Sequence, residues 1–208
     1  MRMAYSGLVT LLILTGCYAK SPSEETEHYL TNRVVQLNQE ALQALEANDP
    51  ELALTHISEA VRADPEYWLL HVNHAAIQVR LGNYDQAMKA YAKAQKLETT
   101  YCDGALAQGF ISERLEKTEE AKKFYAKAAA CFGAVENIEL LDPRSATRLA
   151  LTQYMEKGQV EGLQSINQVL KQYPNYEDAI AIKKKMREND REFFFLYTTA
   201  SIETELEK

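Results

Sequence analysis

Glycine and proline are scarce in this chain. Its 208 residues include 8 glycines and 5 prolines. Both residue types interrupt helices, so their scarcity predicts that the regular segments are helical. The length is enough for one elongated domain with a hydrophobic core of its own.

The chain also lacks an apolar run long enough to cross a membrane. Its amino-terminal apolar run extends only from Leu8 to Leu14, whereas a membrane-spanning helix needs about 18 residues or more. Arg2 precedes this run, and the small residues Thr15 and Gly16 follow it, immediately before Cys17. That order is typical of a secretory signal, so residues 1–16 are predicted to be removed after export.

The four residues LTGC, which end at Cys17, resemble the lipobox of bacterial lipoproteins. The resemblance implies cleavage before Cys17 and attachment of lipid, so that Cys17 carries the whole membrane anchor. Residues 17–31 are polar and are predicted to form a flexible tether. By resemblance to lipoprotein sorting in enterobacteria, Tyr18 rather than an aspartate after the cysteine favours the outer membrane, on its periplasmic side. The alternative is an ordinary signal peptide in which the cysteine stands by chance.

Basic residues are outnumbered by acidic ones. The 23 lysines and arginines against 30 aspartates and glutamates give a net charge of −7, and loss of Arg2 with the signal would make it −8. A nucleic-acid surface needs a concentrated basic stripe, so nucleic acid is not expected as a partner. The dense basic patch of Lys183, Lys184, Lys185 and Arg187 is predicted to be a solvated helix face. Contact with lipid or cell wall is the alternative.

Motifs for catalysis and metal binding are missing as well. The sequence contains no GxSxG, GxxxxGK[ST], HExxH or GxGxxG motif, each of which carries a known chemistry. His71 and His74 are three residues apart, but no carboxylate or cysteine completes an obvious metal site with them. The chain is therefore predicted not to be an enzyme and to hold no metal or cofactor.

The sequence does contain an internal repeat. Segments that begin at Asn48, Gly82 and Glu116 align at equal intervals, and a fourth begins at Lys157 after a longer interval. Mostly small residues recur in three columns and a bulky residue in a fourth. Such columns are expected where antiparallel helices approach closely at small side chains and pack on the next pair through large ones. The columns are Ala53, Ala87, Ala121 and Gly162; Ala60, Ala94, Ala128 and Val169; Ala41, Ala75, Gly109 and Ala150; and Ile57, Tyr91, Tyr125 and Ile166.

This pattern resembles the tetratricopeptide repeat (TPR), most closely in LGNYDQAMKAYAKA, from Leu81 to Ala94. The resemblance implies an all-α solenoid of about four helix-turn-helix repeats over residues 32–175. Residues 176–208 are predicted to form a C-terminal capping helix and a tail, because the last repeat has no neighbour to cover its hydrophobic face. The third copy departs from the family pattern by lacking the terminal proline, and the fourth by having Gly162 in place of alanine.

Two cysteines remain beyond Cys17. In the TPR arrangement Cys102 begins the first helix of the third repeat, and Cys131 lies at the end of the second. These positions lie side by side because the two helices are antiparallel, and an exported protein can be oxidised. The pair is predicted to form a structural disulfide, and two buried free thiols are the alternative.

TPR proteins bind partners mainly in a groove lined by the first helix of each repeat. Carried onto this sequence, the resemblance implies a mostly apolar groove, with Leu42, Leu45, Leu69, Val72, Val79, Leu106, Phe110, Leu151 and Tyr154 as its apolar residues. An exposed apolar surface of this length needs a cover. One alternative is a helix or extended segment of another protein. Another is the chain's own aromatic tail, Phe193 to Tyr197, which could equally join two copies as a homodimer. In a third, the helices are rotated and these residues are ordinary core.

Together these features predict a membrane-anchored scaffold. The chain resembles TPR lipoproteins that bind another exported or envelope protein and support assembly of pilus, secretion or cell-wall machinery. That hypothesis rests on analogy between folds. The alternative is a cognate inhibitor or immunity protein that binds one toxin or enzyme, a role to which an acidic body is suited if the target is basic.

Overall fold

The computed structural model describes residues 30–133 and 141–199, and within these ranges the chain is helical without strands. The predicted all-α TPR fold is confirmed, and α9 follows the four helix pairs as the expected cap. The predicted signal, the tether as far as residue 29, and Cys17 lie outside the described residues. The helices are α1 (Asn32–Glu46), α2 (Pro50–Ala63), α3 (Trp68–Arg80), α4 (Tyr84–Leu97), α5 (Asp103–Arg114), α6 (Thr118–Phe132), α7 (Pro143–Lys157), α8 (Gln159–Gln172), α9 (Glu177–Glu188) and α10 (Arg191–Thr199).

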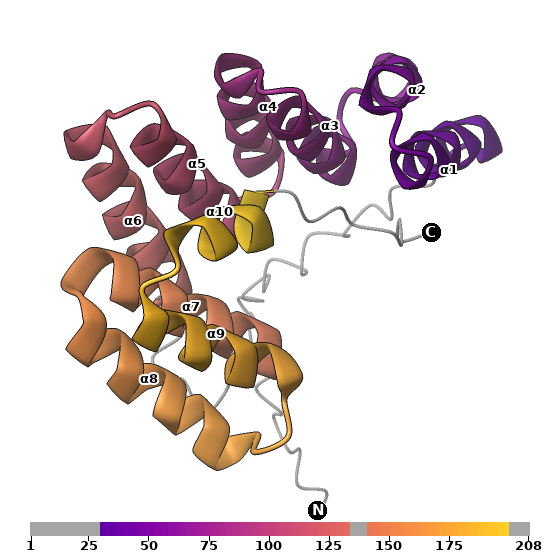
Figure 1. Ribbon diagram of the computed structural model, residues 1–208. Helices are drawn as coiled ribbons and strands as arrows, with labels where there is room; N and C mark the ends of the chain where they lie inside the picture. The colour runs from indigo at the N-terminus through magenta and orange to yellow at the C-terminus, as the bar shows by residue number, and fades with distance from the viewer. Residues whose placement is uncertain (1–29, 134–140, 200–208) are drawn as a thin grey trace, which may run out of the picture.

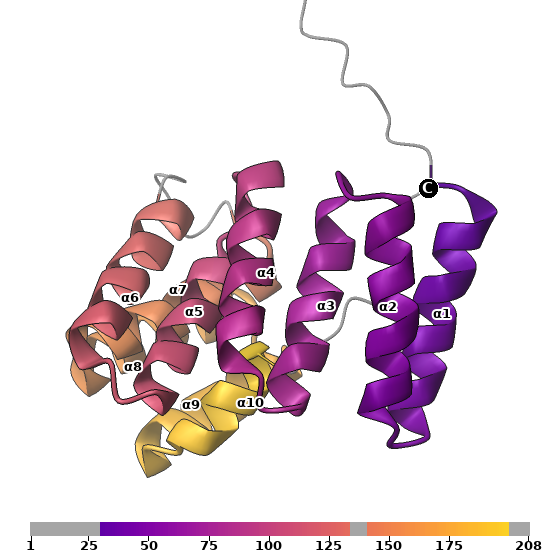
Figure 2. The ribbon, with the colours of Figure 1, turned by 90° about the horizontal axis from the view of Figure 1, so that it is seen from above.

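The helix pairs stack side by side in a curved array (Figure 1). Each helix packs against the next along the chain up to α9, and the view from above shows α1 to α4 side by side (Figure 2). The array curves around α10, which contacts α3, α5 and α9. No helix of the described ranges combines the length and hydropathy that a membrane crossing requires.

The four repeat columns form the core of the array. All sixteen of their residues are buried. Gly162 replaces alanine for a steric reason, because a Cβ there would lie 2.4 Å from the Tyr154 Cβ and 2.7 Å from its Cα. At Gly109 a Cβ would lie 2.4 Å from the ring of Tyr125. Glycine at these positions lets the two helices of a repeat approach more closely than alanine allows.

The turns inside the first three repeats share one conformation. Asn48, Gly82 and Glu116, which are equally spaced along the sequence, have φ values of 58°, 74° and 59°. This left-handed region is strained for residues with a side chain and free of strain for glycine. The fourth turn differs, with Gly158 at a φ of 111°. The repeat in the sequence thus corresponds to a repeat in the backbone conformation of the turns as well as in the packing of the core.

Polar caps and prolines begin several helices. The side chain of Asp49 accepts a hydrogen bond from the Leu52 amide at 3.0 Å, and that of Asp142 accepts from the Arg144 amide at 2.9 Å. Proline follows each cap at the first helical position, where the missing amide proton has no partner to lose. The longer spacing before the fourth repeat falls in the connection between α6 and α7, which includes residues 134–140 outside the described ranges.

The structure joins Cys102 and Cys131 in a disulfide, with their Cα atoms 5.5 Å apart. Cys102 immediately precedes α5, and Cys131 is in the last turn of α6. The bond therefore closes the hairpin of the third repeat at its open end.

Candidate partner-binding site

The predicted groove residues are less accessible than expected. Seven of the nine are buried, so they do not form an open apolar groove along four repeats, and that expectation is corrected. Leu42 and Leu45, both in the first repeat, are half-buried. The buried residues are Leu69, Val72, Val79, Leu106, Phe110, Leu151 and Tyr154.

Two different causes account for this burial. Phe110 packs on the second helix of its own repeat, with its ring centroid 5.5 Å from that of Tyr125. It is ordinary core, as expected for a rotated first helix. Tyr154 instead packs under the tail, with its ring centroid 5.5 Å from that of Phe194. Its hydroxyl donates to Asn189 Oδ1 at 2.7 Å, which ties α7 to the link between α9 and α10.

The aromatic tail forms helix α10 and covers part of the concave side. The sequence predicted a hydrophobic tail in need of a cover but no helix there. Phe194 and Phe195 are buried, whereas Leu196 is 51% exposed. The alternative in which the chain's own tail occupies the groove is thus the observed one over α3 and α5 (Figure 1). Dimerisation through the tail stays a prediction.

A buried arginine holds the C-terminal end of α10. Arg148 of α7 is 4% exposed, and its guanidinium donates to Thr198 Oγ1 at 3.2 Å and to the Tyr197 carbonyl at 3.4 Å. It lies 4.1 Å above the ring of Tyr197, and its Nε is 3.3 Å from Asp103 Oδ1 in an ion pair. A buried charge is tolerated only with such partners. These contacts fix the tail to α5 and α7 together.

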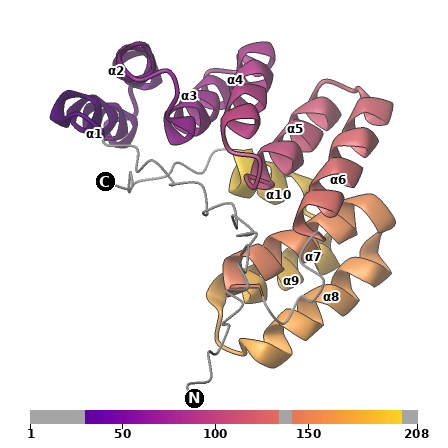
Figure 3. The ribbon, with the colours of Figure 1, turned by 180° about the vertical axis from the view of Figure 1, so that it is seen from behind.

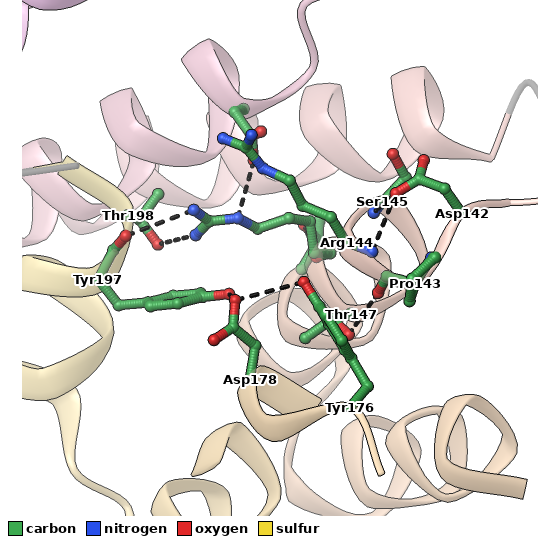
Figure 4. Close-up of polar contacts among 12 residues, drawn as sticks. Asp142, Pro143, Arg144, Ser145, Thr147, Tyr176, Asp178, Tyr197 and Thr198 are labelled. Carbon is green, nitrogen blue, oxygen red and sulfur yellow. Dashed lines mark hydrogen bonds and ion pairs between the residues drawn. The ribbon is translucent and has the colours of Figure 1, made fainter. Parts of the chain in front are cut away.

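Tyrosine hydroxyls extend this network to the capping helix. Tyr197 and Tyr176 both point toward Asp178 in Figure 4, and both donate to its Oδ2, at 2.9 and 3.3 Å. Burial raises the pKa of both phenols, and the nearby Asp178 charge raises them further. They therefore remain protonated donors at neutral pH.

Ion pairs hold the other end of α10. Arg191 approaches Glu113 of α5 at 3.3 Å, and Arg114 pairs with Glu192. The Arg114 guanidinium also lies 4.2 Å from the ring centroid of Phe195. These pairs are partly solvated and contribute little stability singly, but they orient α10 across the end of α5.

A pocket of about 380 Å³ remains between α10 and the turns of the first two repeats. We call it the turn-side pocket; it is lined by Leu45, Asn48, Pro50, Val79, Arg80, Tyr84, Arg114, Glu192, Phe195 and Leu196. Leu45 and Leu196 provide accessible apolar surface. Arg80 is exposed and has no ion pair within the described part of the chain. The pocket can therefore receive an apolar side chain together with a hydrogen-bond acceptor.

The described residues offer no cluster of three or more histidine, cysteine, aspartate or glutamate side chains suited to a metal. His71 instead approaches the Pro65 carbonyl at 2.8 Å through its Nε2. Burial, with a smaller contribution from His71, lowers the pKa of His74. Both histidines thus pack within the fold.

Sequence reasoning missed Arg148, Asp103 and the tail as one unit. The available signal was the aromatic run, which indicated that the tail is buried. It did not indicate against which helices the tail packs. Leu45 and Val79 of the predicted groove also line the turn-side pocket. Partner binding by the predicted groove residues stays a prediction.

Comparison with curated proteins finds a TPR relative. Over 91 residues the chain is 32% identical to the small glutamine-rich tetratricopeptide repeat-containing protein 2 of Saccharomyces cerevisiae (strain ATCC 204508 / S288c). The aligned part is 44% of this chain and 26% of the relative, so the chain spans about a quarter of that protein.

Solved structures with a similar fold are TPR-type arrays. PilW, described as a widely conserved type IV pilus biogenesis factor, has a TM-score of 0.55 at 14% identity, over 84% of this chain and 81% of PilW. A tetratricopeptide repeat protein from Parabacteroides merdae ATCC 43184 has a TM-score of 0.51 at 22% identity, over 81% and 66%. MamA from Desulfovibrio magneticus RS-1 has a TM-score of 0.50 at 16% identity, over 80% and 91%. Identities this low show the fold alone.

A family model described as cell division protein FtsQ/DivIB, C-terminal, matches residues 6–122. The match covers more than half of the chain but ends inside α6, in the middle of a repeat. Its boundary is therefore not a structural boundary, and the match supports no function by itself. By that sequence match the chain belongs to the FtsQ/DivIB C-terminal family, and by its fold it is a tetratricopeptide repeat protein.

Proposed function

We propose that the chain is a lipid-anchored TPR adaptor that binds an apolar segment of another exported protein in the turn-side pocket. The observation that carries the proposal is that α10 covers only part of the concave side. Leu196 of α10 is 51% exposed and lines the turn-side pocket together with half-buried Leu45. Covering the exposed half of a leucine contributes about 1 kcal/mol, so several such contacts can hold a partner.

The envelope setting rests on two further observations. The stretch that ends at Cys17 resembles a lipobox, which favours lipid attachment, and Tyr18 after the cysteine favours the outer membrane on its periplasmic side. The structural neighbour PilW is described as a type IV pilus biogenesis factor. We infer a supporting role in assembling an envelope complex, such as pilus, secretion or cell-wall machinery. No catalytic step is assigned to the chain.

Charge placed in the pocket tests the binding proposal. The full chain is captured from its own membranes as wild type and as Leu196→Glu, with co-purifying proteins identified by mass spectrometry. Leu196 is exposed, so the variant retains its fold while the pocket gains a charge. The matched control is Val160→Glu on α8, where the side chain is 64% exposed and outside the pocket. Loss of one partner in Leu196→Glu but not in Val160→Glu is expected, and equal capture by both contradicts the proposal.

A separate experiment tests the anchor. Acyl labelling and membrane fractionation of Cys17→Ser are expected to show loss of both lipid and membrane association. Labelling that persists in this variant refutes lipidation at Cys17. If the captured partner is instead a single enzyme whose activity falls on binding, the cognate-inhibitor alternative replaces the adaptor.

A further inference from the structure

A second pocket lies at the opposite end of the array from α1. Its lining residues come from α8, the second helix of the fourth repeat, and from α9, which follows it. Both helices lie at this end of the array (Figures 1 and 3). Its volume is about 410 Å³. We call it the end-cap pocket, and it is lined by Leu170, Ile180, Lys183, Lys184, Arg187 and Glu188.

The floor of the end-cap pocket is apolar. Ile180 of α9 is 49% exposed, and Leu170 of α8 is partly buried against the core. A helix that ends a repeat array is expected to turn a polar face outward, because no further repeat covers it. The exposed isoleucine departs from that expectation, which favours a surface that another molecule covers.

The rim of the pocket carries positive charge that no ion pair within residues 30–133 and 141–199 neutralises. Lys183, Lys184 and Arg187 make no ion pair within the residues described. Glu188 lines the same pocket but pairs with Lys185 at 3.2 Å. The chain as a whole has a net charge of −7, so this cluster of positive side chains contrasts with the rest of the molecule. It attracts an anionic partner selectively.

The lining residues of α9 form a stripe along which a helix can lie. Ile180, Lys184 and Arg187 are four and three residues apart, so they form one stripe along α9. A second helix laid in the groove between α8 and α9 can place apolar side chains over Ile180 and carboxylates one turn apart beside the cations. A hollow of about 410 Å³ fits such a ridge of side chains better than it fits the flat surface of a bilayer.

We propose that the end-cap pocket docks an acidic amphipathic helix of another protein. The helix covers Ile180 and Leu170 with its apolar face and pairs its carboxylates with Lys183, Lys184 and Arg187. This surface shares no residue with the turn-side pocket, so the array can hold two proteins at separate sites. If one of the two binding proposals is refuted, the other still stands.

The test uses the full-length chain in detergent and a fluorescent peptide with a leucine stripe flanked by glutamates, made long enough to form a helix by itself. Binding is measured by anisotropy. Lys183→Glu with Lys184→Glu is expected to weaken binding about tenfold or more, since like charges then face each other. The matched control is Lys122→Glu with Lys123→Glu, another adjacent lysine pair on an exposed helix face, which is expected to bind normally. Ile180→Ser, which keeps every charge, is expected to weaken binding through the apolar floor.

Three results overturn the proposal. One is equal weakening by both lysine pairs, which indicates nonspecific attraction, and another is failure of the wild type to bind the peptide. The third concerns membranes. The full chain is placed on phosphatidylcholine vesicles with and without phosphatidylglycerol, and lysine acetylation is mapped. Protection of Lys183 and Lys184 by the anionic vesicles, without peptide binding, assigns the patch to a lipid surface instead.

Discussion

Replacement of Phe194 by alanine measures how firmly α10 is docked. The Phe194 side chain is fully buried and packs edge-on against the rings of Tyr154 and Phe193, at centroid distances of 5.5 and 6.1 Å. Removal of a buried phenylalanine ring costs about 3–5 kcal/mol, because both the transfer free energy and the cavity contribute. Leu196 on the same helix is 51% exposed, so Leu196→Ala is expected to cost about 0.5 kcal/mol or less.

The assay must detect α10 separately from the repeats. A terminal helix can open while the array stays folded, so the loss appears first as local opening. Native-state amide exchange over Arg191–Thr199 is therefore expected to accelerate roughly 10²- to 10⁴-fold in Phe194→Ala, as a loss of about 3–5 kcal/mol requires. The amides of α2 and α4 serve as an internal reference. Their exchange is expected to change much less.

The comparison between the two variants decides the result. If exchange in α10 rises no more in Phe194→Ala than in Leu196→Ala, the buried ring does not dock the helix. The part of the predicted groove that lies under α10, such as Tyr154, would then be open in solution. A uniform acceleration over all helices would instead show that Phe194 stabilises the whole array.

Four further predictions concern the repeat scaffold, each checked by urea unfolding. Glu116→Gly is expected to stabilise the chain by roughly 0.5–1 kcal/mol, because glycine relieves a left-handed turn. Gly82→Ala, at the equivalent turn with no atom within 4 Å of its Cβ, is expected to destabilise by about the same amount; stabilisation there would refute the turn argument. Cys102→Ser with Cys131→Ser is expected to cost about 3–4 kcal/mol, from a loop closed over a separation of 29 residues, and an unchanged unfolding midpoint after reduction would contradict it. Gly162→Ala is expected to cost about 1–3 kcal/mol by overpacking, despite the better helix propensity of alanine.

The repeats were predictable because their determinants are local and recur. A small residue at Ala53 and its equivalents is needed in each copy for the same reason. The same packing requirement is therefore visible four times in the sequence. The disulfide partners could be paired for the same reason, since the positions of Cys102 and Cys131 follow from the repeat. Exposure of the first helices was not predictable in this way. For residues such as Tyr154 it depends on where α10 lies, and α10 occurs once.

The departures from the repeat show where the single-copy tail is held. In the alignment of the repeats, the positions equivalent to Arg148 in the first three copies are Gln39, Asn73 and Ala107. None of these carries a charge, so Arg148 is not required by the packing that the copies share. A buried arginine is costly without partners, and its partners here include the carbonyl and ring of Tyr197, which lie outside the array. A charged residue that breaks an uncharged column is therefore explained by a contact that only one repeat makes, and in this chain that contact is with α10.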